Sequence, residues 1–119
     1  MIPARLELAT STLKAPNPPS MGVDSSNTTD INIRYTFKPG AIDSTHDLPT
    51  SYYYNTASTG AFTKVPTSNY DSVNGWYYYD QAVPPLGTPN AISGYGYASN
   101  AGGNSTTTSA SGTPVAAPV

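Results

Sequence analysis

The strongest structural pattern in this sequence is DINIRYTFK, residues 30–38. Ile31, Ile33, Tyr35 and Phe37 alternate with polar or charged residues, so in an extended chain the apolar side chains share one face. This strict period of two predicts a β-strand that is half buried. A strand with one apolar face needs a second layer of structure to cover it, so the rest of the chain is expected to supply that layer.

Several other stretches predict further strands joined by turns. They are residues 4–12, 50–55, 61–65, 70–73, 76–80 and a short, glycine-weakened edge strand at 91–98. Asn74-Gly75 is the dipeptide most typical of a type I′ hairpin turn, and no window shows a helical period. The sequence therefore predicts an all-β fold, a small antiparallel β-sandwich or sheet of about five to seven strands with extended N- and C-terminal arms.

Three segments are predicted along the chain. Residues 1–29 form an N-terminal strand and an extended loop or arm, residues 30–98 the β-domain, and residues 99–119 a low-complexity C-terminal arm. From residue 100 onward the chain contains only Ala, Gly, Ser, Thr, Asn, Pro and Val. Such a tail buries too little apolar surface to offset its own ordering entropy, so a partner chain is expected to order it. Its deletion should then leave the β-domain folded.

The composition argues against an enzyme. The 119 residues include no cysteine, one histidine, 5 basic and 7 acidic residues, against 10 tyrosines, 12 prolines and 10 glycines. Few side chains can act as acid, base or metal ligand, so no cofactor is expected. His46 lies between Asp43 and Asp47, and a solvated loop is preferred over a metal site or a hydrolase with Ser44 or Ser51 as nucleophile.

The core must be small. Leu, Ile, Val and Phe together number 18, and buried tyrosine rings are expected to supply the missing apolar area. Small domains usually need an additional constraint, and disulfides are excluded because the chain has no cysteine. A homo-oligomer, or docking on a larger lattice, is therefore expected.

Two tyrosine-rich stretches are the candidate binding surface. SYYYN at 51–55 resembles WYYYD at 76–80, which predicts two similar hairpins paired in one sheet. Alternation along a strand places rings on both faces of each stretch, where they can form a core, a protein interface or a glycan platform. The predicted partner-interface residues are Tyr52, Tyr54, Trp76, Tyr77, Tyr79, Arg34, Lys38, Tyr95 and Tyr97.

No targeting segment is visible, and no apolar run is long enough to span a membrane. The chain is expected to be made in the cytoplasm without a signal peptide. Its five Lys and Arg residues are scattered, so direct nucleic-acid binding is not expected.

In its missing signal peptide, its Thr, Asn, Gly and Tyr content, its lack of cysteine and its loose arms, the chain resembles the capsid decoration (cement) and minor virion structural proteins of phages and viruses. The resemblance implies a non-enzymatic virion protein that binds the major capsid protein or other virion subunits. It would stabilise the shell by bridging neighbouring subunits. The alternative is an extracellular carbohydrate-binding or adhesion module of a tail or surface protein, with Trp76 and neighbouring tyrosines as the sugar platform.

Overall fold

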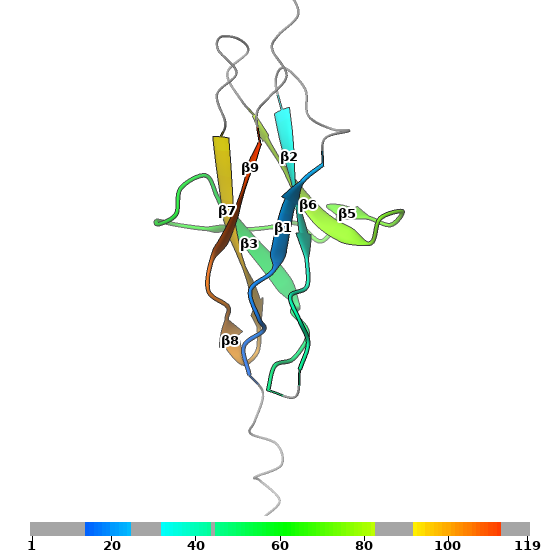
Figure 1. Cartoon of the computed structure of the whole chain (residues 1–119), viewed down its shortest axis with the longest axis vertical. Coiled ribbons are helices and arrows are strands. Elements are labelled where there is room, and N and C mark those ends of the chain that lie inside the picture. Colours follow the sequence, from blue (N-terminus) through cyan, green and yellow to red (C-terminus); the bar gives the residue numbers. More distant parts are fainter. Residues whose placement is uncertain (1–13, 25–31, 44, 83–91, 113–119) are drawn as a thin grey trace, which may run out of the picture.

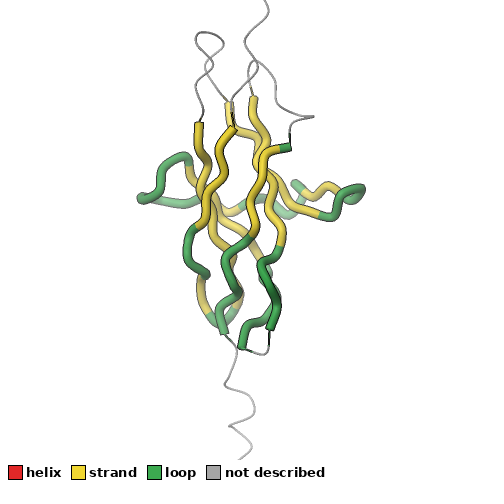
Figure 2. Tube along the Cα trace, viewed as in Figure 1, coloured by secondary structure: helices red, strands yellow, loops and turns green. Residues whose placement is uncertain are grey.

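The computed structural model describes residues 14–24, 32–43, 45–82 and 92–112, and these form nine β-strands packed as two antiparallel sheets (Figures 1 and 2). The prediction of an all-β antiparallel sandwich is confirmed, with more strands than expected. The strand predicted at residues 4–12 lies outside the described residues. Within the described ranges, no helix is long and apolar enough to cross a membrane.

Each sheet is built from strands that are distant in the sequence. Sheet A has the order β1-β2-β6-β5 and consists of β1 (Ser20–Val23), β2 (Asn32–Lys38), β6 (Trp76–Ala82) and β5 (Tyr70–Asp71). Sheet B has the order β4-β3-β7-β8 and consists of β4 (Thr63–Lys64), β3 (Ser51–Asn55), β7 (Ile92–Asn100) and β8 (Gly103–Asn104), with β9 (Thr108–Gly112) also paired to β7. All of these strand pairs are antiparallel.

Strand β2 forms the centre of the core, as its alternation predicts. The side chains of Ile33, Tyr35 and Phe37 are 0%, 1% and 0% exposed and face sheet B. The pairing of β2 with β1 and β6 satisfies its backbone groups on both sides. These three are the largest fully buried side chains, and burying an apolar side chain of this size contributes roughly 1.5–3 kcal/mol.

Strand β7 is the middle of sheet B, which corrects the prediction of an edge strand at 91–98. It pairs with β3 on one side and with β8 and β9 on the other. The glycines that weaken its strand propensity lie beneath the large rings of β2. A Cβ atom at Gly94 would lie 2.8 Å from Tyr35 Cε2, and one at Gly96 would lie 2.5 Å from Phe37 Cε2. Glycine is therefore required where the opposing strand carries aromatic rings.

The predicted boundaries at residues 29/30 and 98/99 are wrong, because parts of both expected arms belong to the sandwich. Strand β1 pairs with β2 along all four of its residues, and Met21 and Val23 pack against the core. Strand β9 pairs with β7 along all five of its residues, and Ala110 packs against the core. Within the described residues, main-chain pairing with β7 and shallow packing hold this polar segment as a strand.

Strands β1 and β9 also contact each other. The Thr108 hydroxyl donates to the Pro19 carbonyl at 3.1 Å, and the two strands lie side by side in Figure 1. They are the outer strands of different sheets, so their contact closes one side of the sandwich.

The two tyrosine-rich hairpins form, but they lie in opposite sheets rather than in one. The hairpin β3–β4 belongs to sheet B and β5–β6 to sheet A, so the similar sequences face each other across the sandwich. The second turn also differs from a two-residue type I′ turn. Residues 72–75 connect Asp71 to Trp76, and Gly75 is the only residue of this turn with a positive φ, +81°.

Replacing Gly96 with alanine should lower the free energy of unfolding by about 1–3 kcal/mol, because the new methyl group must displace the Phe37 ring or the Tyr53 backbone carbonyl. Urea denaturation followed by near-ultraviolet circular dichroism measures the change. Gly102→Ala, in the exposed turn between β7 and β8, is the matched control and should change stability far less. Equal effects of the two substitutions would contradict the packing argument.

Truncation after Asn104 should strongly destabilise the domain, because it removes β9 and exposes the edge of β7. Truncation after Gly112 removes only residues beyond β9 and serves as the control. The thermal midpoints of both truncated chains, compared with the full chain, test this expectation. A domain that stays folded without β9 would restore the sequence-based description of residues 99–119 as a separate arm.

Candidate functional site

Four of the tyrosines predicted as interface residues face the interior. Tyr52 is 5% exposed and belongs to the core, while Tyr54, Tyr77 and Tyr79 are partly buried and pack against it. Tyr54 stacks on Tyr79 across the sandwich, and the Tyr52 and Tyr77 ring centroids are 5.8 Å apart. The residues equivalent in the two similar hairpins thus contact each other. Their assignment to a partner interface is corrected, because the second sheet already covers them.

One end of this inner tyrosine layer opens into a cleft between the two sheets, which we call the aromatic cleft. The Tyr77 ring centroid lies 4.8 Å from that of Tyr70, and the Tyr52 ring centroid lies 5.6 Å from that of Phe37. The cleft has a volume of about 320 Å³ and is lined by Phe37, Pro39, Leu48, Pro49, Thr50, Tyr52, Tyr70, Gly75 and Tyr77. Sequence reasoning did not identify this cleft, because its walls come from four separate segments of the chain.

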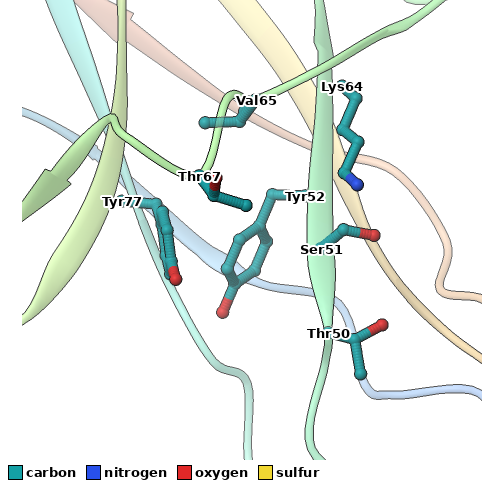
Figure 3. A pocket seen from close by; sticks show the side chains of 7 residues that line it. All are labelled: Thr50, Ser51, Tyr52, Lys64, Val65, Thr67 and Tyr77. Carbon is teal, nitrogen blue, oxygen red and sulfur yellow. The ribbon is translucent and has the colours of Figure 1, made fainter.

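A smaller cavity lies beside the aromatic cleft and shares Thr50, Tyr52 and Tyr77 with it (Figure 3). Its volume of about 10 Å³ is close to that needed for one water molecule. Figure 3 shows the hydroxyl groups of Tyr52 and Tyr77 pointing in the same direction. Burial raises the pKa of Tyr52 to about 12, and the neighbouring Tyr77 adds to the shift. The ring therefore stays neutral and able to donate a hydrogen bond at physiological pH.

The outer face of sheet A pairs cations with aromatic rings. The Arg34 guanidinium lies 3.8 Å from the centroid of the Tyr78 ring. It also forms a bidentate ion pair with Asp80, in which Nε donates to Oδ1 at 2.6 Å and Nη2 to Oδ2 at 2.8 Å. The Lys38 ammonium lies 4.6 Å from the centroid of the Trp76 ring. Arg34 and Lys38 lie on the exposed side of β2 as predicted, but both are already engaged within the chain. The Asp80 hydrogen bond raises the pKa of Arg34 above its usual value.

Trp76 is less available than the glycan-platform alternative requires. Lys38 covers its ring, and its Nε1 atom is shielded from solvent without a hydrogen-bond partner in the part of the chain that the structure describes. Stacking on a sugar needs a free aromatic face. This side chain therefore gives the platform hypothesis no support.

The outer face of sheet B carries a second aromatic group, which we call the outer patch: Tyr53, Tyr97 and Phe62. Tyr53 and Tyr97 are opposite each other on β3 and β7 and stack with centroids 5.0 Å apart. Phe62 packs against Tyr97 at 5.1 Å. Tyr95 alternates with the buried Gly94 and Gly96 and so lies on the same outer side. Of the predicted interface residues, Tyr95 and Tyr97 thus belong to this face, while Tyr53 and Phe62 were missed.

The histidine loop is a local turn. The Asp43 carboxylate accepts hydrogen bonds from the Thr45 amide and hydroxyl, both at 2.8 Å, and lies 2.8 Å from His46 Nδ1. These contacts, the one with His46 foremost, hold the pKa of Asp43 well below its usual range. No group of three or more His, Cys, Asp or Glu side chains able to hold a metal ion is present among the described residues. Ser44, one suggested nucleophile, lies outside them.

A second carboxylate turn fixes the rim of the aromatic cleft. Asp71 accepts hydrogen bonds from the amides of Val73 and Asn74, at 3.0 and 3.1 Å, and from the Asn74 side chain at 2.7 Å. The Asn74 contacts lower the pKa of Asp71. This bonding replaces the expected type I′ turn and presents Gly75 at the cleft.

Comparisons of the chain with protein-family models, with curated proteins and with solved structures gave no significant match. The class that the structure itself defines is a small antiparallel β-sandwich with an aromatic cleft between its sheets and aromatic groups on both outer faces.

The stability of the domain should fall as pH rises from about 10 to 12. Burial raises the pKa of Tyr35 and Tyr52 to about 12, whereas tyrosine in an unfolded chain ionises near pH 10. In this interval the unfolded chain has lost protons that the folded chain retains, so the slope of the unfolding free energy against pH is negative.

Urea denaturation at several pH values, for the wild type and for Tyr52→Phe, measures this slope. The variant keeps the ring but removes one of the shifted groups, so its stability should decline less steeply. Parallel curves for the two proteins would show that Tyr52 does not contribute.

Proposed function

We propose that this chain is a non-enzymatic structural protein that bridges two neighbouring subunits of a larger assembly, of which a virion shell is the favoured example. The observation that carries the proposal is the presence of aromatic groups on both outer faces of one thin sandwich. Trp76 and Tyr78 lie on sheet A, and the outer patch lies on sheet B. A domain that contacts one partner through each face can link the two.

The chemistry of the two faces suits protein partners. Tyr, Trp and Arg are the residue types most enriched at protein interfaces and at their energetic centres. Aromatic rings offer a large contact area at a low cost in conformational entropy. On sheet A, the Arg34 guanidinium is held by Asp80 and the Tyr78 ring, so binding a partner would lose little side-chain freedom there.

The strand edges are less suited to docking than the faces. On one side, β1 and β9 contact each other and close the sandwich. On the other side, the outermost strands β4 and β5 have only two residues each. Short edge strands limit the addition of a further strand from another chain. The faces, together with the loop 56–62 and the β5–β6 hairpin that project from opposite sides in Figure 1, are therefore the favoured contact surfaces.

Outer and inner tyrosines should respond differently to substitution by serine. Loss of an interface anchor costs about 1–3 kcal/mol of binding, so Tyr97→Ser should weaken attachment to the host particle by about tenfold or more and leave the thermal midpoint nearly unchanged. Tyr79→Ser, the matched inner control, should lower the thermal midpoint because it leaves a void between the sheets. Unchanged attachment after Tyr97→Ser would exclude the outer patch as an interface.

Sedimentation of material from the native source tests the proposal as a whole. An antibody raised against the recombinant chain locates it in a density gradient. We expect it in a fast-sedimenting particle at a fixed ratio to the main subunit. Recovery only as a small free protein would exclude a structural role in an assembly.

A further inference from the structure

We propose that the aromatic cleft is a binding site for a neutral carbohydrate, accommodating one pyranose ring. The proposal does not rest on the bridging role, because the residues that line the cleft include none of the aromatic side chains on the two outer faces. Its walls come from the ends of β2 and β3 and from the β5–β6 hairpin, so both sheets contribute to it.

The size of the cleft fits a small ligand. Its volume of about 320 Å³ lies at the lower end of the range of roughly 300–1,000 Å³ for small-molecule sites. One sugar ring, or the terminal ring of a longer glycan, matches this size. The entrance is open because Leu48 and Tyr70 at the rim are 61% and 46% exposed, and because Gly75 has no side chain.

The walls have the chemistry that a sugar requires. A pyranose presents a face of C–H groups, and the rings of Tyr52, Tyr70 and Tyr77 offer apolar surface to such a face. The same rings end in hydroxyl groups, which donate and accept hydrogen bonds. Apolar walls with a few convergent polar groups are typical of ligand sites.

Tyr52 and Tyr77 supply polar groups near the cleft. Tyr52 is only 5% exposed, and both residues line the aromatic cleft and the adjoining small cavity. Their two hydroxyl groups point the same way (Figure 3). A tyrosine hydroxyl both donates and accepts hydrogen bonds, so this pair is suited to a hydroxyl-bearing ligand.

The charge of the cleft selects for a neutral ligand. None of the side chains that line it carries a charge. Lys64 lines only the adjoining small cavity. An anionic sugar or a phosphate would be desolvated in the cleft without a positive charge to pair with. A neutral hexose does not incur this cost.

Nuclear magnetic resonance titration of the ¹⁵N-labelled full chain tests the proposal, with glucose, galactose, mannose and N-acetylglucosamine as probes. We expect saturable shifts of the Thr50, Tyr70 and Gly75 amides for at least one sugar, with a Kd on the order of 1–10 mM, as is usual for so small a ligand. No cleft shift with any of the four sugars up to about 100 mM, ten times the weakest expected Kd, would overturn the proposal.

Two rim variants and two controls assign the site. Tyr70→Ala and Leu48→Ala should each weaken binding, Tyr70→Ala by about tenfold or more because it removes one aromatic wall. Val73→Ala alters a 91% exposed residue of the same hairpin outside the cleft and should bind as the wild type does. Tyr53→Ala, in the outer patch, should also bind normally.

Two further outcomes would overturn the proposal. If Tyr53→Ala abolishes binding and the rim variants do not, the sugar binds the outer patch. If a proline-rich peptide shifts the cleft amides at lower concentration than every sugar, the cleft is a peptide groove. Thermal midpoints of the rim variants control for folding, and Leu48→Ala decides the question if Tyr70→Ala is unfolded.

Discussion

The structure depends on a match between large side chains on one strand and the absence of side chains on another. Tyr35 and Phe37 occupy the space above Gly94 and Gly96, and Ile33 occupies the space above Gly112, where an added Cβ would lie 2.6 Å from Ile33 Cδ1. Protein cores are packed at crystal-like density, so neither side of this match can change alone. The sheets approach closely along these strands, and a chain with few aliphatic residues still buries the inward side chains of its central strand.

This match explains why sequence reasoning succeeded for some strands and failed for others. Alternation in residues 30–38 reports burial directly, because each inward residue is apolar. Apart from Ile92, the inward residues of β7 and β9 are Gly, Ala and Thr, which resemble a loop or a disordered tail. Their burial follows from the size of the opposing rings, and no window of the sequence contains that information. Strand β1, by contrast, shows an alternation of apolar residues in its sequence, Met21 and Val23, that predicts a strand.

For the candidate sites too, the sequence predicted some features and missed others. Alternation along the strands predicted rings on both faces of each tyrosine-rich stretch, but it could not tell which face the other sheet covers. The similar sequences at residues 51–55 and 76–80 occupy positions that face each other across the sandwich. The aromatic cleft was beyond prediction, because it requires the relative placement of the two sheets and a turn held by Asp71.

The dispersal of the core along the chain has a consequence for biosynthesis. Strand β2 pairs with β6, about forty to fifty residues later in the chain. Its rings pack on β7 and Ile33 packs on β9, which ends at Gly112. During translation the rings of β2 leave the ribosome long before their glycine-lined counterpart exists. The domain therefore cannot complete its core until residue 112 has emerged, and folding dominated by such distant pairings is intrinsically slow. Until then, the nascent chain exposes an aromatic strand with open edges, the state in which it is most vulnerable to aggregation.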